Sequence, residues 1–415
     1  MLRRLVNDQT QQDAHRAIEA VARESYGRLV AFLSARTRDV AAAEDALGEA
    51  LIAALCTWPR DGLPRSPEAW LLTAARRRLI DASRHHRVQA DGAPTLELIA
   101  CELAEGTAGQ PFPDERLELL FVCAHPAIDP GMHTPLMLQT VLGLDAAEIA
   151  RAFLVSPAAM GQRLVRAKAK IRDTGIAFEL PQPRDLRERL DAVLNAIYAA
   201  FGSGWEDAAG VDPRARGLTD EAIWLARVLK QRLPAEPEVR GLLSLMLHCE
   251  ARRPARRTAD GRFIPLSDQD ARLWDAPMIA EAERELAAAS AKARPGRFQL
   301  EAAIQSVHAE RAHSGTTDWS AIARFYGSLV EVAPTLGACV GRAAAAGESE
   351  GAASGLSLLD EIDGRSIITY QPYWAVRAHL LRKLGRADDA AAAFDRAIGL
   401  AEDDAVRRFL LDRRG

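Results

Sequence analysis

Helical periodicity along almost the whole chain is the sequence feature that most limits its fold. Apolar residues recur three and four positions apart, and no convincing alternation of apolar and polar residues indicates a strand. The chain is rich in Ala, Leu and Arg, and runs of β-branched residues are scarce. Its 415 residues are long enough for several domains of about 100–200 residues each. The sequence therefore predicts an all-α, multi-domain protein.

Three amphipathic helices are predicted within residues 10–90. The first two cover about residues 14–36 and 40–56, where apolar side chains keep a helical spacing. The third follows Ser66, a suitable N-cap, and has Pro67 at its first helical position. A compact helical module is therefore expected in this part of the chain.

The domain organisation is predicted from a change in composition after the first module. Residues 91–113 are acidic and weakly periodic and contain several Gly and Pro residues, which is typical of a linker. A second compact segment spans residues 114–178, and a third helical region spans residues 179–415.

The third region contains a repeat of 38 residues. Each unit has the pattern helix, Gly turn, helix, with small residues where two helices must approach closely. The second unit fits the tetratricopeptide (TPR) pattern at six positions: Trp374, Ala378, Gly385, Ala390, Phe394 and Ala397. Glu402 stands where that pattern has a proline. We expect helical pairs that stack on one another, because one pair cannot bury its apolar face alone.

Basic residues are concentrated in two places, although the net charge of the chain is −4. A chain average can hide a local basic surface, so the distribution of charge matters more than the total. The first cluster contains five arginines and one acid: Arg76, Arg77, Arg78, Arg84 and Arg87, with Asp81. The second contains six basic residues and no acid: Arg151, Arg163, Arg166, Lys168, Lys170 and Arg172. Both clusters are candidate nucleic-acid contacts.

The second basic cluster lies in a segment with a helix-turn-helix pattern. Asp145 can cap a short helix over 146–153, and Ser156 with Pro157 can start another over about 158–171. The second helix is expected to bury Met160, Leu164, Val165 and Ala169, and to expose Gln162, Arg163, Arg166, Lys168 and Lys170. Gln and Arg early in such a helix suit base edges in the major groove, and later Arg and Lys neutralise phosphates. A solvated basic helix in a helical bundle is the alternative.

Three stretches together resemble bacterial RNA polymerase sigma factors of the extracytoplasmic-function (ECF) type. Residues 39–51 resemble the helix that grips the polymerase clamp, and residues 67–81 resemble the helix that faces the melted −10 element. The helix-turn-helix stands in the place of the module that reads the −35 element. The resemblance implies two partners: core RNA polymerase, through its clamp and flap regions, and promoter DNA.

The resemblance also implies roles for individual residues. Asp45 and Glu49 lie four apart on one helix face and would bind the polymerase, although they could simply be solvated. Trp70 would stack on an unpaired base of the −10 region, although a tryptophan is more often a core residue. Five arginines would line the path of the single strand, with a plain charged helix face as the alternative: Arg76, Arg77, Arg78, Arg84 and Arg87.

The C-terminal part resembles a subgroup of these factors that carries a TPR-like extension. Residues 114–126, residues 266–275 and the repeat near Trp374 carry this likeness. It implies that residues 179–415 regulate activity and have a possible protein or peptide partner. Gly161 departs from the commoner pattern, which has a basic residue there, so the resemblance does not give the promoter sequence.

No constellation of residues indicates an enzyme. The chain has neither a GxxxxGK[ST] phosphate loop nor a GxSxG motif. Cys123, His125 and His133 fit no standard zinc spacing, and His248 with Cys249 sits in an apolar helical run that predicts a core position. We therefore expect no catalytic residue, metal or cofactor.

The cysteines and the apolar runs indicate a cytoplasmic protein. Five scattered cysteines argue against a disulfide framework: Cys56, Cys101, Cys123, Cys249 and Cys339. No apolar run reaches the length of about 18 residues that would predict a membrane span, and the N-terminus lacks a secretory apolar core.

The prediction as a whole is a sigma factor that directs core RNA polymerase to specific promoters and is modulated by its own C-terminal helical domain. One alternative is a helix-turn-helix repressor or activator with a sensor domain, which would bind duplex DNA alone, usually as a symmetric dimer. A second is a TPR-type scaffold that binds peptides and no DNA.

Overall fold

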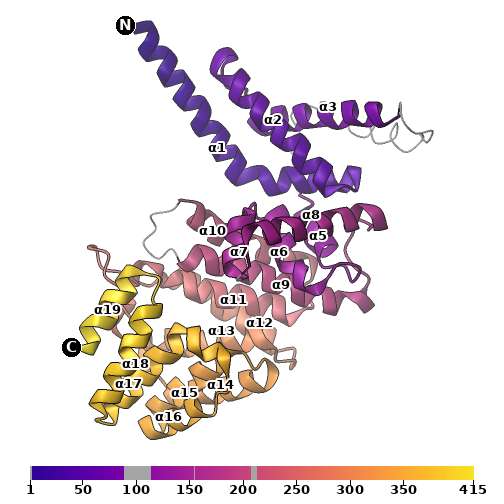
Figure 1. The fold of residues 1–415 in the computed structure, drawn as a ribbon. Helices are drawn as coiled ribbons and strands as arrows, with labels where there is room; N and C mark the ends of the chain where they lie inside the picture. Colours follow the sequence, from indigo (N-terminus) through magenta and orange to yellow (C-terminus); the bar gives the residue numbers. More distant parts are fainter. Residues whose placement is uncertain (1, 88–113, 154, 207–212) are drawn as a thin grey trace. The chain divides into compact units, whose positions relative to one another are not determined.

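The structure is a computed structural model that describes residues 2–87, 114–153, 155–206 and 213–415. Within these ranges every regular element is a helix, and the one isolated bridge joins Arg257 and Phe263 (Figure 1). The predicted all-α fold class is confirmed.

The chain divides into two compact units. The first unit contains residues 1–204 and 214–222, and the second contains 205–213 and 223–415. The helices of the first unit, together with α10, which contributes to both, are α1 (Leu2–Thr37), α2 (Val40–Asp61), α3 (Pro67–Arg87), α5 (Arg116–Cys123), α6 (Pro130–Thr140), α7 (Ala146–Ala152), α8 (Pro157–Thr174), α9 (Pro183–Glu206) and α10 (Pro213–Arg232). The α-helices of the second unit are α11 (Pro237–Ala251), α12 (Ala276–Ser290), α13 (Arg297–Ser314), α14 (Trp319–Val332), α15 (Leu336–Ser349), α16 (Ala352–Asp360), α17 (Gln371–Lys383), α18 (Ala387–Leu400) and α19 (Asp404–Arg414). Its short 3-10 helices are η1 (Arg253–Ala255), η2 (Leu266–Asp268), η3 (Ala271–Leu273) and η4 (Arg365–Thr369).

Helices α1, α2 and α3 form the N-terminal part of the first unit. The Asp39 side chain accepts a hydrogen bond from the Ala42 backbone N–H and so begins α2. α2 continues through Pro59 and ends before Gly62, whose φ of 88° is a conformation that favours glycine. The second predicted helix, over about residues 40–56, therefore extends to Asp61.

Helices α5 to α9, with the start of α10, form the rest of the first unit. Asp145 and Glu148 make a reciprocal capping box at the start of α7, and Ser156 caps α8 through the Ala159 N–H. On α9, the Arg189 guanidinium donates to the carbonyl of Phe121, with Nε 3.2 Å from the oxygen. α9 therefore packs with α5 in the first unit, and the division into compact units lies beyond residue 178.

Close contacts join α1 to α5 and α6 within the first unit. A Cβ on Gly27 would lie 1.9 Å from the carbonyl oxygen of Val141, so only glycine allows α1 to approach this closely. The Arg36 guanidinium donates to the Glu115 carboxylate at 2.8 Å, which ties the end of α1 to the start of α5. The N-terminal helices and α5–α8 thus share one packed unit.

The second unit is a succession of packed helical pairs. The predicted repeat falls on two of them, α15–α16 and α17–α18. Gly355 on α16 approaches α15 so closely that a Cβ there would lie 2.5 Å from the carbonyl oxygen of Ala343. Buried Ala378, Ala390 and Phe394 belong to one apolar cluster between α17 and α18. The small residues of the repeat therefore allow close helix packing.

Candidate nucleic-acid interface

Helix α8 presents a basic face. Its buried positions are Met160, Leu164, Ala167, Lys168 and Ile171, and its exposed ones include Gln162, Arg163, Val165, Arg166 and Lys170. The prediction that Val165 is buried was wrong, because it is 66% exposed. The buried residues keep a helical spacing that places positions 167 and 168 on the inner face of α8. Position 165 then lies on the outer face, together with positions 162 and 166. One apolar side chain thus lies among the basic residues of the exposed face.

The prediction that Lys168 is exposed was also wrong, since only 10% of its side chain is exposed. Its ammonium group donates to the carboxylate of Glu44 on α2, which is 13% exposed. Burial raises the pKa of Glu44, and the charge and hydrogen bond of Lys168 oppose that shift. In this conformation Lys168 joins α8 to α2 and is not available to DNA.

A hollow of about 460 Å³ lies beside the basic face of α8. Arg163, Arg166 and Lys170 line one side of it, and the segment from Ala127 to Met132 lines the other. Three cationic side chains around an open hollow can bind a phosphate group by charge-assisted hydrogen bonds. The structure therefore brings together three of the predicted −35 contacts.

Trp70 on α3 is half-buried. Its ring meets the buried Trp58 edge to face, with centroids 5.5 Å apart and planes at 75°. This contact anchors Trp70 to the N-terminal core, while the ring remains partly accessible for stacking on a base.

The arginines of α3 have different surroundings. Arg76 is half-buried, with its guanidinium carbon 5.3 Å from the centre of the Phe32 ring, and burial is the main cause that lowers its pKa. Arg77 is exposed, and Arg78 Nε lies 3.2 Å from a carboxylate oxygen of Glu49. The side chains of Arg84 and Arg87 lie outside the described residues.

The outward face of α2 combines acidic and apolar side chains. Asp45 and Glu49 are exposed as predicted, and Ile52 and Leu55 are 62% and 41% exposed. The ion pair of Glu49 with Arg78 is more than half exposed, so it contributes about 0–1 kcal/mol and can exchange for another partner. Sequence reasoning missed Ile52 and Leu55, whose signal is the helical spacing: Ile52 follows Glu49 by three residues, and Leu55 follows Ile52 by three.

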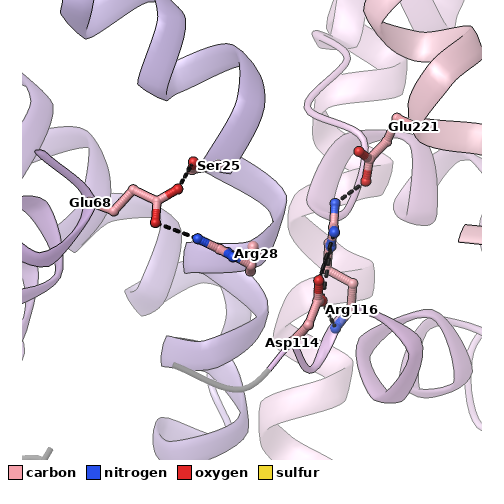
Figure 2. A network of polar contacts seen from close by, with 6 residues as sticks. All are labelled: Ser25, Arg28, Glu68, Asp114, Arg116 and Glu221. Carbon is pink, nitrogen blue, oxygen red and sulfur yellow. Dashed lines mark hydrogen bonds and ion pairs between the residues drawn. The ribbon is translucent and has the colours of Figure 1, made fainter. Parts of the chain in front are cut away.

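Two polar networks hold the first unit together (Figure 2). In one, Glu68 on α3 accepts hydrogen bonds from Ser25 and Arg28 on α1. In the other, Arg116 is bound by Asp114 at 2.7 Å and by Glu221 of α10. Only 8% of the Arg116 side chain is exposed, so these acids offset a buried charge.

The other candidate chemical groups have structural partners. Burial raises the pKa of the Cys123 thiol to about 12, and its sulfur lies 3.5 Å from the Thr140 hydroxyl. His125 accepts from the Ala127 N–H, and His133 contacts the Ile128 carbonyl. His248 and Cys249 are 1% and 8% exposed, which confirms the predicted core position.

In the part of the chain that the structure describes, the cysteines are free thiols and no metal-binding cluster is formed. No group of three His, Cys, Asp or Glu side chains there could hold a metal ion. Four cysteines are free thiols, namely Cys56, Cys123, Cys249 and Cys339, and Cys101 lies outside the described residues. None of the described helices combines the length and the apolar character needed to cross a membrane.

Comparisons with known proteins divide the chain into recognisable parts. Residues 21–88 match sigma-70 region 2, and residues 189–290 match a family of unknown function, DUF6596. A protein of Rhizobium meliloti (strain 1021), described as uncharacterized, is 41% identical over 370 residues, which are 88% of this chain and 87% of the relative. No solved structure matches. The first match contains α2 and α3 with the acidic, aromatic and arginine residues described above, whereas α8 lies outside both matches.

Proposed function

The chain belongs to the family that it shares with the Rhizobium meliloti protein and carries a sigma-70 region 2, the domain of sigma-70 family sigma factors; from this premise we propose that it is an ECF-type sigma factor. It directs core RNA polymerase to specific promoters and acts in the cytoplasm, where transcription takes place. The observation that carries the proposal is the coincidence of the region 2 match with the exposed face of α2 and the Trp70–arginine face of α3.

The polymerase contact in this proposal is the outward face of α2. Asp45 and Glu49 would pair with basic residues of the clamp, and Ile52 and Leu55 would supply an apolar centre. A partner with an apolar patch and a basic rim fits this surface, since such interfaces have apolar cores and polar rims. The weak pair between Glu49 and Arg78 would exchange when the polymerase binds.

The −10 contact is the face of α3 that contains Trp70 and the arginines. Trp70 is partly accessible and held by Trp58, so it can offer a fixed ring to an unpaired base. Arg77 and Arg78 are exposed and can neutralise phosphates of the melted strand. Arg76 is packed near Phe32 and would contribute its positive charge from a less accessible position.

The −35 contact is the exposed face of α8. Gln162 and Arg163, early in the helix, suit adenine and guanine edges, and Arg166 and Lys170 suit phosphates. Val165 is exposed between them and can contact a thymine methyl group. We assign α7 and α8 as a helix-turn-helix on this ground.

Lys168 has a different role in the proposal. Its pair with Glu44 holds α8 against α2, the helix that would bind the clamp. Any DNA contact by Lys168 requires this pair to break. The first unit as described would therefore be a closed form that opens when polymerase and promoter bind.

The C-terminal part would be a TPR-like domain that regulates the factor. The helical pairs α15–α16 and α17–α18 carry the 38-residue repeat and support this assignment. The matched DUF6596 segment lies before them in the chain. A protein or peptide is the class of partner that such stacked pairs suit.

Run-off transcription tests the proposal. Purified core polymerase is supplied with promoter fragments from upstream of this gene and its neighbours, with and without the full chain. We expect specific transcripts only with the protein, and their loss in the double variant Arg163→Ala/Arg166→Ala. Arg184→Ala is the matched control, because this arginine is 84% exposed and lies on α9 rather than on α8.

The other outcomes favour other functions. Binding to duplex DNA without polymerase, and no directed transcription, would favour a repressor or activator. Absence of both DNA and polymerase binding would favour a peptide-binding scaffold. Either result would overturn the sigma-factor proposal.

A further inference from the structure

One end of the α11–α13 helix pair in the second unit is polar, although paired helices usually bury apolar side chains there. α11 and the residue after it contribute His248, Cys249 and Arg252. α13 contributes Gln305, His308 and Arg311 from one face, three residues apart. The irregular segment 253–275 covers this corner with the 3-10 helices η1, η2 and η3. Polar side chains that are buried in this way need hydrogen-bond partners, so the partners of each one matter here.

Arg252 is the central residue of the corner and is only 6% exposed. Its Nη2 lies 2.5 Å from Oε1 of Gln305 and 3.8 Å from the Cys249 sulfur. Its Nη1 is buried and has no hydrogen-bond partner in the described part of the chain. A buried guanidinium without a counter-charge destabilises a fold, so a partner for it is expected.

Two neighbouring arginines on the same segment are paired with acids, in contrast to Arg252. Arg253 lies 2.7 Å from the carboxylate of Glu250, and Arg257 is paired with Asp403. Cys249 does not supply the missing charge, because burial raises the pKa of its thiol and keeps it neutral.

A second buried donor lies beside Arg252. The Asp275 N–H donates to the Ala251 carbonyl at 2.9 Å, and this bond brings the backbone of Trp274 close to that of Arg252. Trp274 is 6% exposed, and its Nε1 has no acceptor among the described residues. The corner therefore holds an N–H donor of Arg252 and one of Trp274 that lack acceptors, and the two ring nitrogens of His248 also lack hydrogen-bond partners among the described residues.

Positive charge surrounds these donors. The guanidinium carbon of Arg311 lies 5.1 Å from the centre of the Trp274 ring, and Arg311 donates to the Gln269 carbonyl at 3.0 Å. Burial, and then the charges of Arg252 and Arg311, lower the pKa of His308 to about 4, so this histidine stays neutral.

The acids Glu301 of α13 and Glu283 of α12 have other partners. Glu301 lies 2.8 Å from Arg297, and Glu283 accepts from the Ser306 hydroxyl at 2.7 Å. Neither carboxylate is hydrogen-bonded to Arg252. The field in the corner is therefore positive and favours an anion.

We propose that this corner is a binding site for a small oxyanion, a carboxylate or a phosphate group, which accepts hydrogen bonds from Arg252 Nη1 and Trp274 Nε1. Charge-assisted bonds from a buried guanidinium are strong, and the anion supplies the missing counter-charge. The cover, residues 253–275, has only short 3-10 helices and one isolated bridge, so it can open locally to admit a small ligand. The inference does not depend on sigma-factor activity.

Titration of the full chain with two probes tests the site. Inorganic phosphate and acetate are each added at constant ionic strength, with sodium chloride as the reference, and binding is followed by calorimetry and by thermal unfolding. At a ligand concentration ten times Kd, the equilibrium constant for unfolding should fall about elevenfold. A response to phosphate alone identifies a phosphate-type ligand, and a response to acetate alone a carboxylate. The absence of any response to both probes overturns the proposal.

Three variants show whether the response comes from this corner. Arg252→Met should abolish binding. Without ligand, its free energy of unfolding should equal or exceed that of the wild type, because an unpaired buried charge is removed. Trp274→Phe keeps an aromatic ring, removes the N–H and should weaken binding about two- to tenfold. Arg272→Gln is the matched control, since Arg272 lies on the same segment with a 90% exposed side chain. Unchanged binding in both corner variants, or equal loss in the control, would contradict the assignment.

Discussion

The pair between Lys168 and Glu44 gives a prediction whose size follows from burial and pH. Replacing Lys168 by Met leaves Glu44 buried with no counter-charge. Glu44 then takes up a proton, which at pH 7 costs about 3.4 kcal/mol, at about 1.36 kcal/mol for each pH unit above its ordinary pKa of 4.5. At pH 5 the same step costs only about 0.7 kcal/mol. The destabilisation should therefore be much larger at pH 7 than at pH 5.

The sign of this pH dependence follows from proton binding. Burial raises the pKa of Glu44 above 4.5, so between that value and the raised one the native state binds more protons than the unfolded state. Stability then falls as pH rises through this interval. In the Lys168→Met variant the pKa of Glu44 rises further, because the opposing charge is lost, and the interval widens toward pH 7.

Hydrogen–deuterium exchange of the full chain, followed in peptides from α2 and α8, measures the effect locally. We expect protection in Lys168→Met to fall up to about 300-fold at pH 7 and about threefold at pH 5, after correction for intrinsic rates. Lys170→Met is the control, because it makes the same substitution at an exposed position of α8. The double variant Lys168→Met/Glu44→Leu should keep protection near that of the wild type, since no buried charge remains. An equal loss at both pH values, or none, would refute the reasoning.

Three further predictions concern packing and binding. Gly27→Ala should destabilise the first unit by about 1–3 kcal/mol in urea unfolding, because the new methyl group would overlap the Val141 carbonyl. Unchanged stability would mean that α1 does not lie this close to Val141. Arg166→Ala/Lys170→Ala should reduce the slope of log K against log salt for promoter DNA by about 1.8, at about 0.9 per phosphate contact, and an unchanged slope would exclude phosphate contacts there. Ile52→Asp should weaken binding to core polymerase at least about tenfold in a pull-down titration, because it places a charge in the apolar centre of the proposed contact. The circular dichroism spectrum should not change, because Ile52 is 62% exposed.

Local signals in the sequence were sufficient to predict most helix positions. Asp145 and Ser156 cap helices where the sequence predicts caps, and their side chains act on backbone groups only two or three residues away. Gly62 ends α2 for an equally local reason, its positive φ.

The candidate site was harder to predict where residues far apart in the sequence determine which side chains are buried. Whether Lys168 or Val165 points inward depends on Glu44, which lies 124 positions away in sequence, and a helical period alone does not contain that information. The polar corner around Arg252 is a similar case. The sequence predicted His248 and Cys249 as core residues, but the convergence of Arg252, Trp274 and α13 requires the tertiary fold.

The bond between Arg116 and Glu221 has a consequence for the way the chain is made. The two residues are 105 positions apart, so Arg116 leaves the ribosome well before its partner exists. At about 5–20 residues per second, this wait lasts about 5–20 seconds, during which the start of α5 has only Asp114 to offset its charge. A shortened chain that ends at residue 178 would lack Glu221 permanently, so Arg116 would have only Asp114 as a counter-charge. It would also lack the hydrogen bond from Arg189 to the Phe121 carbonyl. Truncations meant to separate the regulatory region should therefore keep residues through 222, where the first unit is complete.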